Sequence, residues 1–196
     1  MKSILLIFGL LISSALLAGG YEIGDKVSDF KLKNIDGKMV SLADMKDSKG
    51  AIVIFTCNHC PYSVATEDRI IALDKKYKTK GFPVIAINPN DPKIQPEDSF
   101  DLMKVRAKEK GFTFPYIFDE KQTVYKEFGA TRTPHVFIVS NKGGEFYLEY
   151  IGAIDDSTRE PKNVEEKYVE QAVDALLAGK KPKVKETKAI GCSIKD

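Results

Sequence analysis

The chain has 196 residues, a formal net charge of +2, 43% hydrophobic residues and 30% charged residues. This length accommodates one domain with a sizeable core. The nearly balanced charge excludes the strong positive field expected of a nucleic-acid-binding protein. With three cysteines in a chain of this length, a small disulfide-stapled scaffold is also excluded. We therefore expect apolar burial to hold the fold together and leave the cysteines available for chemistry.

The first segment has the three-part layout of a secretory signal peptide. A short positive start, Met1-Lys2-Ser3, precedes an apolar stretch at 4–17 and the small residues Ala18-Gly19-Gly20, which predicts cleavage after Ala18 or Gly20. The apolar stretch is shorter than the roughly 20 residues of a membrane-spanning helix. We expect an exported protein, periplasmic or secreted, that touches a membrane only if this leader stays uncleaved.

The rest of the chain indicates one domain and a tail. Residues 1–20 form the predicted signal peptide, 21–179 the domain, and 180–196 a charged C-terminal tail with no apolar period. Alternating residues on both sides of Asp36-Gly37 predict a β-hairpin, and continuous apolar runs predict buried strands. Strands are expected at 30–33, 39–42, 51–56, 83–87, 116–118, 135–139 and 146–151. Helices are expected at 63–77, 100–110, 123–128 and 164–177.

The motif Cys57-Asn58-His59-Cys60 joins a buried strand to the start of a helix. Free N–H groups and the helix dipole stabilise a thiolate there, which predicts a pKa for Cys57 below the ordinary value of about 8.5. We expect Cys57 to be the nucleophile, Cys60 the resolving thiol, and Cys57–Cys60 the redox disulfide. The alternatives are a structural disulfide or half of a zinc site, but zinc needs about four ligands and no second CxxC follows.

The order of elements resembles a known fold. A strand, the CxxC, a helix, a strand, a helix, and then Thr133-Pro134 before a β-hairpin is similar to the thioredoxin fold over about 22–177. The N-terminal Asp29-Phe30 and Asp36-Gly37 resemble the redoxin branch, around alkyl hydroperoxide reductase and thiol-specific antioxidant (AhpC/TSA) proteins. The resemblance implies an α/β fold with a mixed central β-sheet flanked by helices and an N-terminal β-hairpin.

Three separated motifs resemble a subgroup of exported thioredoxin-family proteins. They are 55–62, which contains the CxxC, 96–100, and Gly191-Cys192-Ser193-Ile194-Lys195. The chain departs from this subgroup by ending in Asp196 rather than tryptophan, and by having Arg132 where a cysteine usually precedes Thr-Pro. Any relay that depends on that cysteine is therefore absent.

The resemblance implies an exported thiol–disulfide oxidoreductase that uses the CxxC dithiol. Its partners would be disulfide-containing or dithiol proteins or small thiols, with an upstream redox partner of undefined identity. No cofactor and no metal ion are expected, because the dithiol is itself the redox group. Two other functions remain open: a peroxiredoxin-like thiol peroxidase and a copper-binding carrier.

The two alternatives differ in what the residues support. The Pro-x-x-x-Thr-x-x-Cys loop of peroxiredoxins is missing, because Gly50 and Ile54 stand at the proline and threonine positions before Cys57. Copper carriers of this fold space their cysteines by three residues instead of two. A copper site would combine Cys57 and Cys60 with a histidine near the facing loop, such as His135.

Several further residues receive a role from the resemblance. Pro134 is similar to the cis-proline that faces the CxxC, which would present the backbone of Thr133 to a substrate strand; the alternative is a trans proline at a strand start. His59 would stabilise the Cys57 thiolate and make the disulfide more oxidising; the alternative is an exposed histidine with little effect.

Four residues are left with two readings each. Glu67 is either the buried acid beneath the dithiol or part of a charged helix face. Arg132 is either close to the thiols or a solvated loop residue. His135 is expected to be packed in the core, the alternative being the copper site described above. Cys192 is either a third redox thiol carried on the tail or a free thiol in a disordered end.

Overall fold

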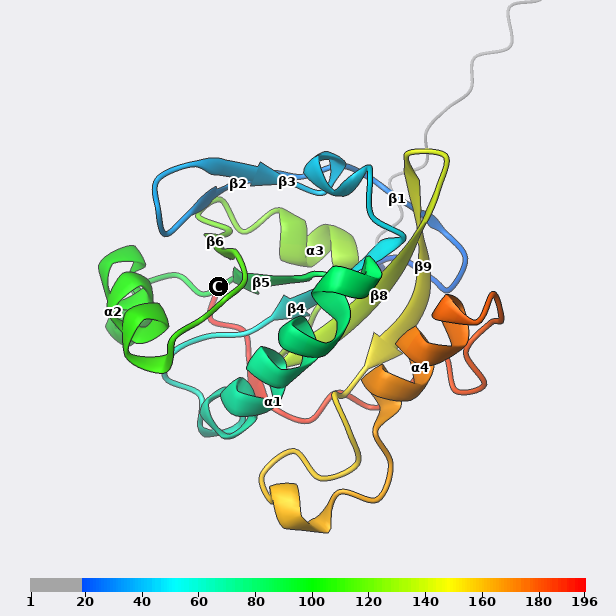
Figure 1. Ribbon diagram of the computed structural model, residues 1–196. Helices are drawn as coiled ribbons and strands as arrows, with labels where there is room; N and C mark the ends of the chain where they lie inside the picture. Colours follow the sequence, from blue (N-terminus) through cyan, green and yellow to red (C-terminus); the bar gives the residue numbers. More distant parts are fainter. Residues whose placement is uncertain (1–18) are drawn as a thin grey trace, which may run out of the picture.

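Figure 1 shows the computed structural model, which describes residues 19–196; residues 1–18, and with them nearly all of the predicted signal peptide, lie outside the described part. Eight strands form one sheet in the order β1-β9-β8-β4-β5-β6-β2-β3, and β10 and β7 form a separate pair. The strands are β1 Lys26–Val27, β2 Lys31–Asn34, β3 Met39–Ser41, β4 Gly50–Phe55, β5 Val84–Asn88, β6 Tyr116–Phe118, β7 Arg132–Thr133, β8 His135–Lys142, β9 Glu145–Gly152 and β10 Cys192–Ser193.

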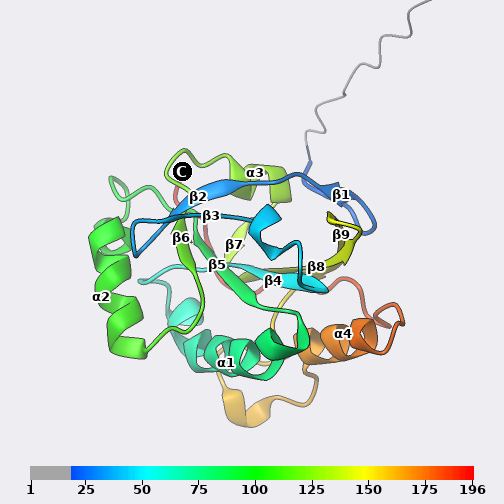
Figure 2. The same ribbon diagram turned by 45° about the horizontal axis from the view of Figure 1, so that its top comes forward.

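Helices cover both faces of the sheet, as Figure 2 shows with α1 and α4 on one side and α3 on the other. The α-helices are α1 Pro61–Tyr77, α2 Phe100–Lys110, α3 Val124–Phe128 and α4 Tyr168–Leu177. Short 3-10 helices lie at Ala43–Met45, Lys78–Lys80, Pro96–Asp98 and Pro161–Asn163. Within residues 19–196, no helix is both long enough and apolar enough to cross a bilayer.

The alternation of side chains along the central strands builds two cores. Ile52 and Ile54 of β4 face the cluster under α1, α2 and α4, whereas Val53 and Phe55 face the cluster under α3. All four side chains are fully buried, because β4 lies in the middle of the sheet with helices on both faces. The mixed sheet flanked by helices, with the β2–β3 hairpin near the N-terminus, confirms the predicted thioredoxin-like α/β fold.

Strand register places the CxxC opposite the Thr133-Pro134 loop. β4 runs parallel to β5 and antiparallel to β8, with Phe55 paired to His135. Cys57 follows the end of β4 by two residues, and Pro134 directly precedes β8. The two segments therefore meet at the same edge of the sheet.

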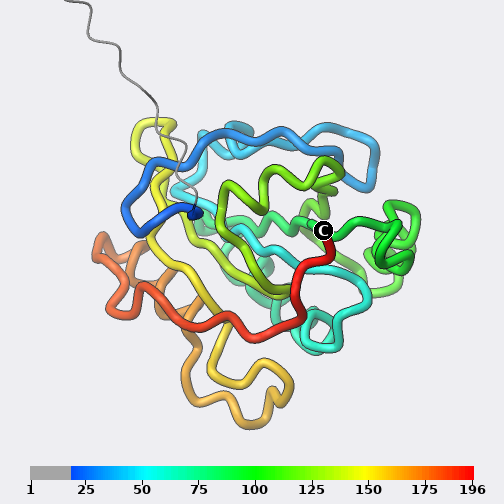
Figure 3. The backbone as a smooth tube through the Cα atoms, turned by 180° about the vertical axis from the view of Figure 1, so that it is seen from behind, coloured from blue at the N-terminus to red at the C-terminus, as the bar shows by residue number. Residues whose placement is uncertain are grey.

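The tail departs from expectation. Residues 180–196 are a charged tail with no apolar period, yet Cys192 and Ser193 form β10, which pairs antiparallel with Thr133 and Arg132 of β7. Figure 3 shows the tail in red, crossing the molecule from the α4 side. A two-residue strand has no apolar period, so hydropathy alone gave no signal for it.

Candidate active site

The CxxC loop ends where helix α1 begins. Cys60 is the N-cap residue, with extended backbone angles (φ −65°, ψ 122°), and Pro61 occupies the first turn, where its missing N–H is not needed. The helix thus starts two residues earlier than the predicted Ser63. Cys60 directly precedes the helix, and Cys57 lies in the connection between β4 and α1.

The disulfide of the structure is not the expected Cys57–Cys60 pair. It joins Cys60 to Cys192, across 132 residues of sequence and 6.0 Å between the Cα atoms, and Cys57 is a free thiol. The cause is the pairing of β10 with β7, which brings Cys192 to the CxxC loop. A Cys57–Cys60 disulfide stays a prediction for another redox state of the protein.

Thr133 lies between the two sulfurs of the motif. Its hydroxyl oxygen is 3.2 Å from Sγ of Cys57, and its carbonyl oxygen is 3.2 Å from Sγ of Cys60. The peptide bond between Thr133 and Pro134 is cis, as the resemblance implied. The backbone of Thr133 pairs with an extended strand, and that strand is the protein's own tail.

Cys57 and Cys60 are both buried, with exposed fractions of 2% and 0%. Burial first, and then the negative charge of Asp98, raise the pKa of the Cys57 thiol to about 11. The hydroxyl groups of Thr133 and Ser63 and the backbone N–H of Cys60 act in the opposite direction. The predicted low pKa is therefore wrong for this state, because desolvation outweighs the donors around the sulfur.

Asp98 is the centre of a buried polar network that sequence reasoning did not assign. Its carboxylate accepts hydrogen bonds from the backbone N–H groups of Asn58 (2.7 Å) and His59 (3.2 Å) and from the side-chain amide of Asn90 (2.6 Å). These bonds attach the CxxC loop to the 3-10 helix Pro96–Asp98. The segment 96–100 was one of the motifs of the resemblance, but a motif alone does not reveal which residue points inward.

His59 connects Asp98 to the free thiol. Its Nδ1 lies 2.5 Å from Oδ2 of Asp98 and 3.6 Å from Sγ of Cys57. Because a carboxylate only accepts hydrogen bonds, the proton of this contact resides on Nδ1 when Asp98 is ionised. The ring is largely buried, so the alternative of an exposed histidine with little effect does not describe its place in the structure.

Two of the other candidates lie outside this group. Glu67 is buried, but its carboxylate binds Arg106 through two hydrogen bonds of 2.7 Å and lies 3.4 Å from Lys110. Arg132 is exposed on β7.

His135 is packed, as expected. Its Nδ1 accepts a hydrogen bond from the N–H of Thr131 (3.3 Å), and its ring lies against Phe137. Burial lowers the pKa of His135 to about 4, so the imidazole is neutral at ordinary pH. It is not part of the polar cluster around Cys57.

The donors that a copper ion would need are only partly assembled. Among the described residues, Cys57, His59 and Asp98 form one cluster whose ligand atoms all lie within 4.8 Å of one another. Cys60 is bonded to Cys192 in the disulfide, and His135 does not belong to the cluster. The dithiol–histidine set of the copper-carrier alternative is therefore not present in this redox state.

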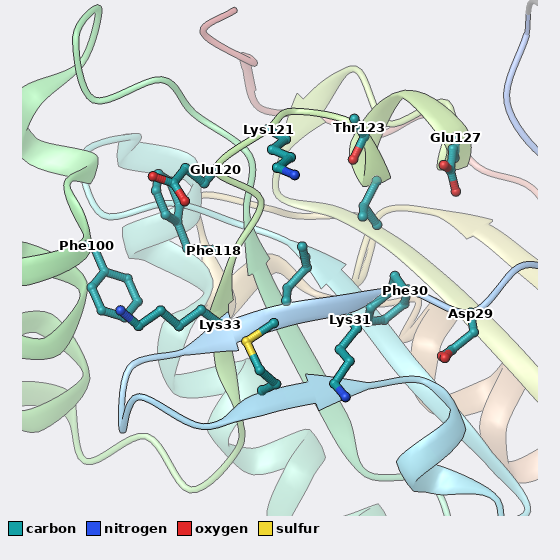
Figure 4. Close-up of a pocket in the computed structure, with 13 residues that line it drawn as sticks. Asp29, Phe30, Lys31, Lys33, Phe100, Phe118, Glu120, Lys121, Thr123 and Glu127 are labelled. Carbon is teal, nitrogen blue, oxygen red and sulfur yellow. The ribbon is translucent and has the colours of Figure 1, made fainter.

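A separate hollow of about 570 Å³ lies between the β2–β3 hairpin and the segment from β6 to α3, with lysine, glutamate and phenylalanine side chains around it (Figure 4). None of the three cysteines lines it. The reacting groups are instead gathered under the tail, so the hollow and the cysteine site are distinct features.

The fold and the site together define a thioredoxin-fold protein with a CxxC motif that faces a cis-proline loop. Comparison with family models matches residues 23–144 to the AhpC/TSA family, and the chain belongs to this family.

Solved structures and curated relatives agree with that assignment. The crystal structure of an uncharacterized conserved protein from Geobacillus kaustophilus is similar at 37% identity, with a TM-score of 0.81 over 89% of this chain and 92% of that one. A hypothetical protein from Sinorhizobium meliloti 1021 matches at 33% identity and a TM-score of 0.81, over 90% of this chain and 96% of that one. Thiol-disulfide oxidoreductase ResA from Halalkalibacterium halodurans is 23% identical over 133 residues, which are 68% of this chain and 70% of that protein.

Proposed function

We propose that this thiol–disulfide oxidoreductase of the thioredoxin fold acts through Cys57 as the attacking thiol and Cys60 as the resolving thiol. The observation that carries the proposal is the position of Thr133. Its side chain contacts one sulfur and its carbonyl oxygen lies next to the other, each at 3.2 Å, immediately before a cis-proline. Both sulfurs therefore lie at one backbone edge that accepts an extended strand.

The reaction is an exchange of disulfides. In the fully reduced protein, the Cys57 thiolate attacks one sulfur of a client disulfide, and the other client sulfur leaves as a thiolate. The Cys60 thiolate then attacks Cys57 in this mixed disulfide, which forms the Cys57–Cys60 disulfide and releases the second client sulfur. The client gains two electrons, and an external dithiol must supply two electrons to restore the enzyme.

A trapping experiment tests these two roles. With Cys60→Ser and Cys192→Ser combined, Cys57 is the single cysteine of the chain and nothing in cis can resolve a mixed disulfide. We expect this variant to accumulate mixed disulfides with a model client such as insulin, detected by mass. The matched control, Cys57→Ser with Cys192→Ser, should accumulate fewer. Full insulin-reducing activity in Cys57→Ser/Cys60→Ser protein would show that the proposal is wrong.

The direction of electron flow follows from the reduction potential of the Cys57–Cys60 pair. We propose measuring it in Cys192→Ser protein, where only this pair can form, in graded glutathione buffers. A value of about −120 to −200 mV identifies an oxidant or isomerase, and a value near −270 mV identifies a reductant. Failure to form the pair at any potential would overturn the exchange mechanism.

We also propose that the protein is exported, to the periplasm or the exterior. The support is the layout of residues 1–20, whose small residues Ala18, Gly19 and Gly20 allow cleavage at two places. Gly20 packs against Gly129, where a Cβ on Gly20 would lie 2.6 Å from the Gly129 Cα. Of the two places, only cleavage after Ala18 keeps this contact in the mature chain. Sequencing the N-terminus of protein from an extracytoplasmic fraction tests it, and an intact Met1 would contradict it.

A further inference from the structure

The C-terminal strand occupies the edge that a client segment would need. Cys192 is in register with Thr133, and Ser193 with Arg132. A Cβ at Gly191 would lie 2.2 Å from the carbonyl oxygen of Thr133, so the strand reaches this edge only because residue 191 is glycine. The tail therefore binds to the residue before the cis-proline as a closely fitted extended segment.

Contacts on both sides of Cys192 hold this segment without help from the disulfide. On the N-terminal side, Thr187 donates its N–H to Ile151 (2.9 Å), and its hydroxyl accepts the N–H of Ala153 (2.9 Å). On the C-terminal side, Ile194 is buried in the core cluster under α3. The tail is thus anchored at two places, with the cysteine between them.

The last two residues fix the far end of the strand. The N–H of Lys195 donates to Asn90 (2.9 Å), and the carbonyl of Lys195 accepts from the N–H of Asp91 (2.8 Å). The hydroxyl of Tyr125 donates to the side chain of Asp196 (2.8 Å). Because the polypeptide stays attached on both sides, breaking the disulfide leaves the sulfur of Cys192 close to the site.

The three sulfurs differ in access. Cys57 and Cys60 are buried, whereas Cys192 is partly exposed at the surface. Thr133 contacts Cys57 and adjoins Cys60, and Cys60 is bonded to Cys192. A free thiol and a disulfide thus contact the same residue, and exchange proceeds by attack of a thiolate on one sulfur of a disulfide.

We propose that Cys192 is a third redox cysteine and that the tail is a client-like strand in cis, which exchanges its disulfide with the CxxC. The Cys57 thiolate attacks Sγ of Cys60, the Cys60–Cys192 bond breaks, and Cys192 leaves as a thiolate that takes up the proton lost by Cys57. One disulfide and one thiol are present before and after, so no external oxidant or reductant takes part. The product has the Cys57–Cys60 disulfide and a tail that only non-covalent contacts hold at the edge of β7. This inference rests on the proposed exchange function.

Native alkylation of the oxidised protein tests the exchange. The protein is incubated with excess N-ethylmaleimide, and the labelled cysteine and the remaining disulfide are identified in peptides by mass. We expect the label to accumulate on Cys192 while the Cys57–Cys60 disulfide replaces Cys60–Cys192. Label on Cys57 alone, with the Cys60–Cys192 disulfide intact, would overturn the proposal and identify a static structural disulfide.

Matched variants separate this proposal from the function on which it rests. In Cys57→Ser protein no third thiol exists, so Cys192 should remain unlabelled over the same time. Gly191→Ala weakens docking without removing a cysteine and should speed labelling of Cys192 several-fold, whereas Ser193→Ala, at an exposed position of β10, should not. Insulin reduction by Cys192→Ser protein tests the CxxC alone. If that variant is active but the wild type shows no exchange with Cys192, only the role of Cys192 is refuted.

Discussion

Two buried carboxylates near helix α1 show opposite ways of keeping an acid inside this protein. Glu67, on the helix, is 3% exposed, and its charge is matched by Arg106 and Lys110. Asp98, on the segment before α2, is fully buried and has no lysine or arginine partner within residues 19–196. Its carboxylate is held by backbone N–H groups, the Asn90 amide and the ring of His59.

The difference determines which acid influences the thiol. The charge of Glu67 is neutralised locally by two cations, so its field is small at a distance. The charge of Asp98 is stabilised by dipoles, and, after burial, it is the charge of Asp98 that raises the pKa of Cys57. A buried acid near a dithiol is thus not automatically part of its chemistry. We infer that Glu67 serves stability and Asp98 serves the reactive loop.

Glu67→Gln gives the largest expected effect, and the effect is on stability. The substitution leaves Arg106 without its carboxylate, and breaking a buried ion pair costs about 3–5 kcal/mol. Because Arg106 keeps partial access to water, we expect the lower end, about 3 kcal/mol, in the free energy of urea unfolding. Asp68→Asn, at an exposed neighbouring position, is the control and should change little. A thiol pKa altered by Glu67→Gln would contradict the division of roles.

His135 extends the comparison to a buried group that stays neutral. Burial lowers the pKa of His135 from 6.5 to about 4, so the unfolded chain binds the proton more tightly than the folded one. The contribution of neutral His135 to the free energy of unfolding is fully present above about pH 6.5. It decreases as the pH falls toward 4, by about 3 kcal/mol at most. In denaturant titrations between these pH values, the free energy of unfolding of His135→Gln protein should fall less steeply than that of the wild type. If the free energies of unfolding of the two proteins changed equally with pH, the lowered pKa of His135 would be contradicted.

Asp98→Asn removes a charge while keeping an oxygen for the two backbone N–H groups. In a Cys60→Ser/Cys192→Ser background, Cys57 is the single cysteine of the chain, so the thiolate absorbance reports its own titration. We expect the midpoint to fall by about one pH unit, which is about tenfold more thiolate at a given pH. It should stay above the ordinary thiol value, because burial remains the larger cause. Glu97→Gln, one residue away and exposed, is the control; equal shifts in both variants would mean that the field is not specific to Asp98.

The sequence predicted the main elements because their signals are local. The apolar run that became β4, the amphipathic period of α4 and the glycines that end α2 and α3 are all readable from neighbouring residues. The CxxC and the Thr133-Pro134 loop were identified from motif and order, and the cis bond confirmed that resemblance.

The site could not be completed in the same way, because its remaining parts are non-local. Cys192 joins Cys60 across 132 residues, and nothing in the spacing of three cysteines determines that pairing. The prediction of a low pKa for Cys57 took account only of its place at the helix start. In the folded chain the thiol is buried, and burial raises its pKa instead. Asp98 stood inside a recognised motif, but its contact with His59 depends on how two distant loops pack.

His59→Ala is the smallest expected effect and the sharpest test of the comparison, because its sign opposes that of Asp98→Asn. Without the ring, the Cys57 thiolate loses the Nδ1 group at 3.6 Å, while Asp98 keeps its charge. We expect the thiol midpoint to rise by about half a pH unit, which is about 0.7 kcal/mol.

The same loss should appear in the redox equilibrium where the thiolate is populated. At a pH above the thiol midpoint, a less stable thiolate destabilises the reduced protein, so in the Cys192→Ser background the Cys57–Cys60 potential should become about 15 mV more negative. At neutral pH, where Cys57 of the reduced protein carries its proton, the potential should not change. Cys192→Ser alone is the reference. A shift of His59→Ala in the same direction as Asp98→Asn would mean that the imidazole acts only by holding the carboxylate in place. Opposite shifts would establish that His59 and Asp98 set the reactivity of Cys57 as a balanced pair, the one stabilising its thiolate and the other opposing it.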